Sequence, residues 1–352
     1  MRLSTKSNIA IGQAILAAAL FGMSAPFSKM LLLRIPPLLL SSLLYLGAGT
    51  GMLIIDIARR FSNIKNQEAR LSKNEFPYII LMILLDIAAP ISLMFGLTRT
   101  NSSTAALLNN FEIVATFVIA LVVFKETISK RLWVSIIFIT ISSFILSIKD
   151  FSKFSFSIGA IFVLLACIFW GLENNCTRKL SIKDPLQVVI IKGFGSGAGA
   201  FVIALLANEI LWDTTYIILS LLLGFFAYGL SIFFYVTAQR YLGAARTSTY
   251  YAVAPFIGVG ISVIVLSEPI TIYFILASII MIIGAYLAVV EKHCHEHAHL
   301  FIEHEHRHNH SDGHHNHTHP FPVKEEHSHL HEHEEIIHTH EHTPDIHHNH
   351  VH

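Results

Sequence analysis

Four ionisable side chains lie inside long apolar stretches of this 352-residue chain: Asp86, Glu112, Glu173 and Lys192. Placing an ionisable group inside an apolar helix of membrane-spanning length costs at least ~2.5–3.5 kcal/mol, so such a group usually has a partner or a function. Asp86 and Glu112 have no evident basic partner, which suits them to bind a proton or another cation. The alternative is a protonated acid that hydrogen-bonds to a neighbouring helix. We favour the first interpretation.

Glu173 and Lys192 flank a short polar connection and lie at similar depths in their apolar stretches. An ion pair between them is therefore predicted, serving either transport or the neutralisation of two buried charges. Amides accompany the acids. They suit a polar substrate, but amides also join membrane helices through hydrogen bonds of roughly 0.6 kcal/mol each. The amide positions are Asn109, Asn110, Asn174 and Asn175.

All 23 histidines lie between His293 and His352. Most alternate with other residues, which places successive imidazoles on one side of an extended chain. Imidazole binds zinc, nickel, cobalt and copper, so the tail is predicted to bind transition metals with low selectivity, although no cofactor is required. The candidate ligands are His293, His295, His297, His299, His304, His306, His308, His310, His327, His329, His331, His333, His338, His340 and His342.

The composition of this tail predicts disorder in the absence of metal. Feeding metal to a transport path, buffering metal and sensing pH all stay open as its purpose.

The net charge of zero conceals two different polymers. Residues 1–292 carry 22 basic and 13 acidic residues, whereas residues 293–352 carry 2 and 11. The whole chain is only 14% charged and 53% hydrophobic, which excludes a soluble globular enzyme. The sequence contains no basic cluster typical of nucleic-acid binding, no nucleotide-binding loop and no nucleophile–base pattern. Neither an enzyme nor a nucleic-acid partner is expected.

Continuous apolar runs of about 20 residues, the length of a membrane-spanning helix, recur before the tail. Such runs favour helices over a β-barrel in a lipid bilayer. The expected fold is all-α and polytopic. Pro26, Pro90 and Pro255 are candidate helix breaks. The ten predicted spans lie near residues 9–33, 38–57, 77–97, 102–124, 131–148, 157–177, 185–207, 215–236, 247–267 and 271–290.

Lys and Arg in the connections predict the orientation, because they are retained on the cytoplasmic side. With the N-terminus inside, 16 basic residues of the connections and ends fall inside and five fall outside. The sequence therefore predicts a multi-pass protein of the cytoplasmic membrane. Both termini, and the histidine tail with them, are expected in the cytoplasm.

The two halves of the apolar region are similar to each other. Residues 20–23 align with residues 169–172, and the stretch ending at Glu126 aligns with the stretch ending at Glu268. A repeat of five helices crosses the membrane an odd number of times, so the second copy must be inverted. The predicted division is a first repeat at 1–150, a second at 151–292 and the tail at 293–352.

This plan resembles the EamA type of the drug/metabolite transporter superfamily. The resemblance covers roughly residues 9–290 and rests on Phe-Trp-Gly-Leu at 169–172 and on the ninth span. There, small residues from Ala244 lead through Pro255 to a terminal Glu268. The fourth span departs from this pattern, with Glu112-Ile113 where proline would be expected. The resemblance implies secondary transport of small organic solutes, and the fold does not select among them.

The expected function is proton-coupled, alternating-access transport of a small organic metabolite such as an amino acid or amine, with coupling through Asp86 or Glu112. The alternative is efflux of nickel, cobalt or zinc with the tail collecting the metal. A non-transporting metal-binding scaffold ranks third. The apolar region contains no histidine and two cysteines, a poor ligand set for soft metals. Homodimerisation stays open.

Overall fold

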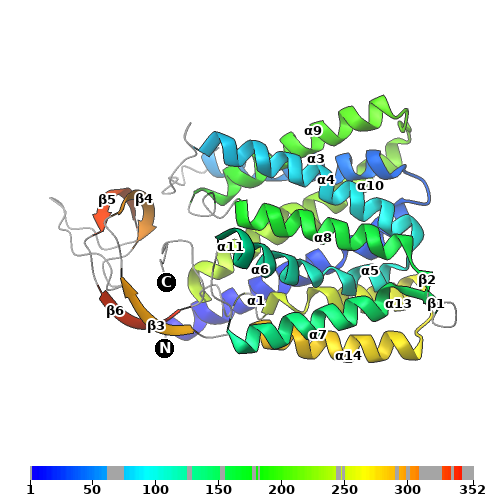
Figure 1. The fold of residues 1–352 in the computed structure, drawn as a ribbon. Helices are drawn as coiled ribbons and strands as arrows, with labels where there is room; N and C mark the ends of the chain where they lie inside the picture. Colours follow the sequence, from blue (N-terminus) through cyan, green and yellow to red (C-terminus); the bar gives the residue numbers. More distant parts are fainter. Residues whose placement is uncertain are drawn as a thin grey trace.

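The helices of the computed structural model lie side by side and form a bundle (Figure 1). The structure describes residues 2–61, 75–124, 129–150, 155–176, 180, 183–242, 247 and 250–289. In the tail it describes 293–298, 302–308, 327–333 and 337–342. Large apolar side chains cover the outside of the bundle: Val122 is 69% exposed and Ile264 is 80% exposed. Such a surface is stable in lipid and not in water.

In the part of the chain that the structure describes, nine helices are long and apolar enough to cross a membrane, and one shorter apolar helix lies at the ninth predicted span. The all-α polytopic fold is therefore confirmed. The helices are α1 (Arg2–Gly22), α2 (Ser24–Leu31), α3 (Pro37–Phe61), α4 (Phe76–Arg99), α5 (Ser102–Leu108), α6 (Phe111–Phe124), α7 (Lys130–Ser147), α8 (Ile158–Cys176), α9 (Pro185–Leu206), α10 (Thr214–Gly224), the π-helix η3 (Phe225–Leu230), α11 (Ser231–Leu242), α13 (Ala254–Leu266) and α14 (Ile272–Val289).

Several spans are interrupted, and proline explains only some of the interruptions. The turn between α1 and α2 precedes Pro26, and α13 begins one residue before Pro255, after a turn. Pro90, the second candidate for a break, lies inside an uninterrupted α4, as a lone proline that does no more than kink a helix would. The fourth span breaks at Asn109–Asn110 with no proline present. There the amides of Glu112 and Ile113 donate to carbonyls three residues earlier, each at 3.1 Å.

The most extensive helix contacts join the two halves of the chain. They pair α3 with α9, α4 with α8, α7 with α14 and α1 with α11. Exchanging the halves would map α3–α9 and α7–α14 onto themselves, and α4–α8 onto α1–α11. This pairing is what two inverted repeats related by a pseudo-two-fold axis would produce.

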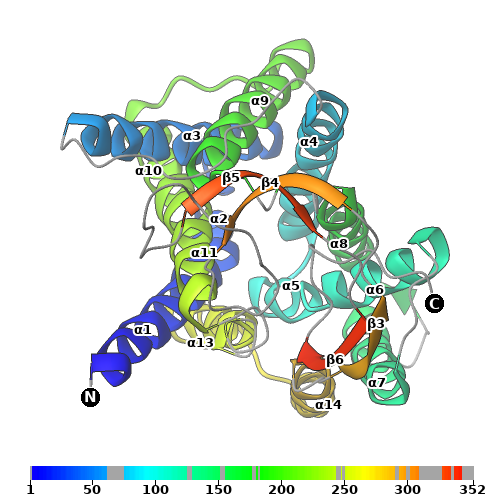
Figure 2. The ribbon, with the colours of Figure 1, turned by 90° about the vertical axis from the view of Figure 1, so that its left-hand side faces the viewer.

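The bundle has two distinct ends. The tail end carries the start of α1 and the end of α14. The hairpin end carries β1 (Ile148–Asp150) and β2 (Ser155–Phe156) (Figure 1). Beyond α14, β3 (His293–Ala298) pairs with β6 (Ile337–His342), and β4 (Ile302–His308) pairs with β5 (His327–His333), both antiparallel. Figure 2 shows these strands from the tail side. The composition predicts no regular structure for these four segments.

Glycines bring α3 and α9 into close contact. A Cβ atom on Gly193 would lie 2.5 Å from the Gly49 backbone, and one on Gly197 would lie 2.8 Å from Leu46. Two further glycines of α9 face α4. A Cβ atom on Gly195 would contact the Ile83 side chain, and one on Gly199 would contact the Ile87 side chain. Small residues at such crossings allow membrane helices to approach closely. The glycines of α9 therefore set its distance from two helices at once.

We expect Gly193→Ala to destabilise the protein, because its Cβ would meet backbone atoms that no side-chain rotation can move away. Overpacking of this kind costs roughly 1–3 kcal/mol. Gly260→Ala is the matched control, since nothing lies within 4 Å of its Cβ position and alanine favours a helix. Thermal unfolding in detergent should show a lower Tm for Gly193→Ala only. Equal Tm values for both variants would contradict this account of the packing.

Candidate functional site

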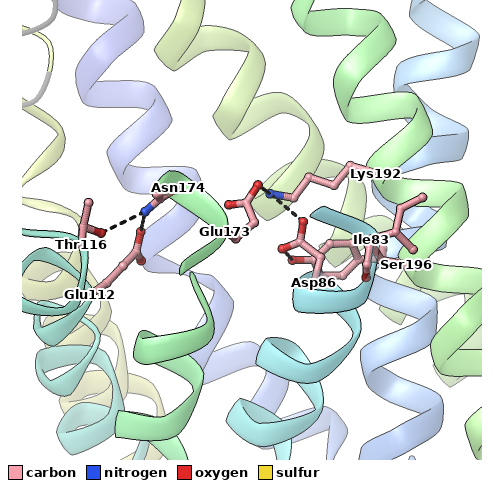
Figure 3. A network of polar contacts seen from close by, with 9 residues as sticks. Ile83, Asp86, Glu112, Thr116, Glu173, Asn174, Lys192 and Ser196 are labelled. Atoms are coloured by element: carbon pink, nitrogen blue, oxygen red, sulfur yellow. Dashed lines mark hydrogen bonds and ion pairs between the residues drawn. The ribbon is translucent and has the colours of Figure 1, made fainter. Parts of the chain in front are cut away.

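A buried ion-pair cluster lies where α4, α8 and α9 meet. The Lys192 Nζ atom is 3.0 Å from Asp86 Oδ2 and 3.3 Å from Glu173 Oε1 (Figure 3). Asp86 is completely buried and Glu173 is 5% exposed. The predicted contact between Glu173 and Lys192 is therefore present. The expectation that Asp86 lacks a basic partner was wrong, because Lys192 pairs with both acids.

The surrounding helices position this cluster. Tyr45 of α3 donates its hydroxyl proton to Asp86 Oδ1 at 3.0 Å. Ser196, one turn after Lys192, donates to the Ile83 carbonyl of α4 at 3.3 Å. These bonds and the close glycine packing of α9 fix the lysine over the α4 turn that carries Asp86. A buried charge is tolerated when it is both paired and hydrogen-bonded.

A second polar group lies on the other side of the same α8 turn. Asn174 Nδ2 donates to Glu112 Oε1 at 2.7 Å and lies 3.4 Å from Thr116 Oγ1, both on α6 (Figure 3). Consecutive residues of α8, Glu173 and Asn174, thus belong to two different networks. Glu112 is half-buried and Asn174 is exposed. This second group is accessible, whereas the ion-pair cluster is buried.

The helix break places Glu112 where the fourth span restarts. Because α6 begins at Phe111, Glu112 stands in its first turn, where the helix dipole favours a negative charge. The amides of Glu112 and Ile113 already donate to the carbonyls of Asn109 and Asn110, so the contact with the carboxylate comes from the Asn174 side chain.

The four amides have different roles. Asn175 donates to the Gly171 carbonyl at 2.8 Å and to the Thr116 carbonyl at 3.0 Å, so it joins α8 to α6. Asn110 donates to the Leu107 carbonyl within its own span at 3.3 Å. The Oδ1 atom of Asn109 is buried and has no hydrogen-bond partner among the described residues. Asn174 contacts the acid, as described above.

A row of aromatic rings leads from Tyr251, which precedes α13, to the ion-pair cluster. The Tyr251 ring is 4.8 Å from Tyr235 and 5.8 Å from Phe21. Phe21 is 6.2 Å from Tyr228, which is 5.6 Å from Tyr45. Tyr45 ends the row on Asp86. The alternation of apolar residues gave no signal for this row, because its members come from distant segments.

A separate polar network closes the hairpin end. The carboxylate of Glu268 accepts from the Ser102 amide at 2.7 Å, the Ser102 hydroxyl at 2.8 Å and the Ser103 amide at 2.8 Å. Lys29 donates to the carbonyls of Leu97 and Thr100. The corner between α4 and α5 is thus held by the first and ninth spans together. Partial burial raises the pKa of Glu268, but these hydrogen bonds outweigh it and leave the pKa below its ordinary value.

Some of the residues singled out in the sequence lie outside the described residues. Glu126 is outside the described residues, as are His299 and His310. For the remaining histidines in the predicted ligand set, the structure describes strand backbone only. Metal binding by the tail therefore stays a prediction.

The halves of the chain both match the EamA-like transporter family, at residues 8–148 and 157–290. The chain belongs to this family. A protein of Methanothermobacter thermautotrophicus named "uncharacterized transporter" is 27% identical over 290 residues, which cover 78% of this chain and 84% of that protein. A Clostridium kluyveri protein of the same name is 24% identical over 251 residues, covering 66% and 78%. The molecule is a multi-pass membrane transporter of the EamA-like family.

A solved crystal structure shares the fold of this EamA-like chain. It superposes with a TM-score of 0.57 at 14% sequence identity, covering 79% of this chain and 95% of that chain. At this identity the likeness concerns the arrangement of helices. The polar groups described above must therefore be interpreted from their own geometry.

We expect Lys192→Met to destabilise the transporter more than Asp86→Asn does. Removing the lysine leaves two buried carboxylates without their shared cation, and breaking a buried ion pair costs roughly 3–5 kcal/mol. Asp86→Asn keeps the contact between Lys192 and Glu173. Thermal unfolding of both variants in the same detergent tests this difference. A smaller loss for Lys192→Met would contradict the shared-cation arrangement.

We expect Glu268→Gln to loosen the start of α5, because glutamine carries no charge to attract the backbone amides. Hydrogen–deuterium exchange of the peptide that contains Ser102 and Ser103 should accelerate. In the unsubstituted protein the lowered pKa keeps Glu268 ionised above about pH 4.5, near the reference value. Protection, corrected for intrinsic exchange, should therefore persist from pH 5 to 8 and fall only at lower pH.

Glu209→Gln is the control for this measurement. Glu209 accepts from the Leu38 amide at 3.1 Å, near the start of α3, so its loss should accelerate exchange there and not at Ser102. Unchanged exchange at Ser102 and Ser103 in Glu268→Gln would show that the carboxylate does not hold this corner.

Proposed function

We propose that this EamA-like protein is a proton-coupled secondary active transporter of a small organic metabolite such as an amino acid or amine. It works by alternating access in the cytoplasmic membrane. The tail end faces the cytoplasm, in accord with the distribution of Lys and Arg. The substrate lies near the middle of the bilayer, between the two halves.

The observation that carries the proposal is the charge balance at the centre of the bundle. Asp86 and Glu173 share one ammonium group, that of Lys192, and a third carboxylate, that of Glu112, contacts Asn174, the residue that follows Glu173. If all four were ionised, the charge would be −2 in an environment that disfavours net charge. Protons or substrate cations are the species that can remove this excess. Such a centre holds a proton to reduce its excess negative charge, and it releases that proton when a substrate cation or a change of conformation stabilises the ionised carboxylate instead.

The closed hairpin end supports alternating access. Glu268 of the second half holds the start of α5 in the first half through hydrogen bonds from the Ser102 and Ser103 amides. These bonds cross between the halves, so they must break when the halves move apart at this end. Rearrangement of one repeat against the other is how inverted-repeat transporters expose a central site alternately to the two sides.

An organic solute fits the centre better than a transition metal. Lys192 pairs with both Asp86 and Glu173, and its positive charge opposes entry of a divalent cation. The accessible group on the other side of α8 contains one carboxylate and one amide, Glu112 and Asn174, and a row of aromatic rings ends at Asp86. Aromatic rings and amides recognise organic molecules, whereas borderline metals prefer several imidazole or thiolate ligands.

The proposal is tested with full-length protein in proteoliposomes under an inward or outward pH gradient. Fluxes of amino acids, amines, zinc and nickel are measured in parallel. We expect pH-driven flux of an organic solute, and a loss of tenfold or more in Glu112→Gln or Asp86→Asn, because each removes a site for proton binding. Full activity in both variants would refute proton coupling at this centre, and pH-driven metal flux alone would favour the metal-efflux alternative.

Asp56→Asn is the matched control for the loss of an acid. Asp56 lies on α3 and pairs with Arg60 of the same helix at 2.6 Å, away from the central cluster. Its replacement should leave the pH-driven flux unchanged.

A further inference from the structure

We propose that the histidine tail contains two metal sites of four histidines each, one on each pair of its strands, and that they bind a divalent metal ion such as zinc. Composition alone predicts metal binding spread over the whole tail. The strand pairing instead selects twelve of the histidines and places them in a defined order. This inference concerns the tail and does not depend on which solute crosses the membrane.

Each pair of strands places histidines directly opposite one another. We call β3 with β6 the outer ladder and β4 with β5 the inner ladder (Figure 2). Opposite residues of an antiparallel ladder have Cβ atoms about 4.5–5.5 Å apart. The outer pairs are His293 with His342, His295 with His340 and His297 with His338, and the inner pairs are His304 with His331, His306 with His329 and His308 with His327.

The three histidine pairs of a ladder lie on one face. Successive residues of a strand alternate between the two faces, and these pairs are two residues apart. The opposite face of each ladder contains no histidine within the described strands. Neighbouring pairs are about 7 Å apart along the strands. Two neighbouring pairs therefore supply four histidines, the number of ligands that a tetrahedral zinc site takes.

The two ladders continue the same register. His297 and His304 are seven residues apart in one arm of the tail, and their partners, His338 and His331, are also seven residues apart in the other arm. The tail thus folds back on itself, with the inner ladder nested within the outer one. A shift of one residue would remove all six histidine pairs, because His295, for example, would lie opposite Glu341 or Thr339.

This register also suits a metal ion better than it suits a hairpin without one. An isolated two-stranded ladder is marginally stable in water, and like charges directly opposite each other destabilise it, as protonated imidazoles would. Neutral imidazoles can bind one metal ion together, and the binding free energy then stabilises the fold that assembles them. The tail carries 11 acidic and 2 basic residues, a charge that attracts divalent cations.

The middle pair of a ladder belongs to every possible four-histidine site on it. Of three pairs in a row, either end pair combines with the middle one. Loss of an end pair therefore leaves one complete site. Loss of the middle pair, such as His295 with His340, leaves two pairs about 13 Å apart, twice the spacing of neighbours. This difference distinguishes ordered sites from chelation by an unstructured tail.

The experiment titrates full-length protein in detergent with zinc at pH 7.5, where imidazole is mostly neutral, in the presence of a competing chelator. We expect two tightly bound zinc ions per protein. His295→Gln/His340→Gln removes the middle pair of the outer ladder and should retain only one. The affinity for the other ion should fall at least ~10-fold, because even indirect partners of a metal ligand contribute 10–100-fold.

His293→Gln/His342→Gln is the matched control. It removes the same number of histidines from the same two strands, but only an end pair, so two zinc ions should still bind. Hydrogen–deuterium exchange supplies the second measurement. Zinc should protect residues 293–298 and 337–342 together, and the middle-pair variant should lose this protection in both segments. The inner ladder, residues 302–308 and 327–333, should stay protected in either variant.

Three outcomes would overturn the inference. The first is an equal loss of zinc from both variants, which would show that only the number of histidines matters. The second is zinc binding that leaves amide exchange in all four strands unchanged. The third is fewer than two tightly bound zinc ions in the unsubstituted protein. Thermal unfolding of both variants without zinc should match that of the unsubstituted protein, since the substitutions lie outside the helical bundle.

Discussion

One ammonium group shared by two buried carboxylates is the constraint on which the centre of this transporter depends. Lys192 must remain within ion-pair distance of both Asp86 and Glu173, so α4, α8 and α9 cannot separate without exposing an unpaired charge. A buried charge without its partner costs several kcal/mol. The glycines of α9 satisfy this requirement from the backbone, because they let α3 and α4 approach on either side. Packing and charge thus require the same arrangement of helices.

The break in the fourth span differs from this tightly paired cluster, because it places a carboxylate that forms no ion pair with Lys192 in the described part of the chain. Asn109 and Asn110 interrupt the helix, and Glu112 gains a helix N-terminus. Asn174 reaches this acid from the residue after Glu173, so α8 links the fixed cluster to the accessible one.

Sequence reasoning identified the features that depend on local pattern. Runs of apolar residues predicted the spans, and the depths of Glu173 and Lys192 in successive spans predicted their contact. The contact between Asp86 and Lys192 could not be predicted, because it depends on how α4 packs against α9, and these helices are distant in the chain. The break at Asn109–Asn110 was missed because no proline marks it. Conversely, Pro90 suggested a break where tertiary packing maintains a continuous α4.

Glu268 shows a further limit. Comparison of the halves identified the residue, but its partners are backbone amides, and backbone groups leave no mark in a sequence. The same comparison aligns Glu112 with Ala254 and Ile113 with Pro255. Both spans turn close to this position, by proline in one half and by amides in the other. The shape of the break is therefore common to the halves, whereas the acid occurs in one of them. Pseudosymmetry accounts for a discontinuity at the same position of both halves, and the carboxylate of Glu112 stands beside only one of them. A second acid at the position of Ala254 would add one more negative charge to those of Asp86, Glu112 and Glu173, which already exceed the single positive charge of Lys192.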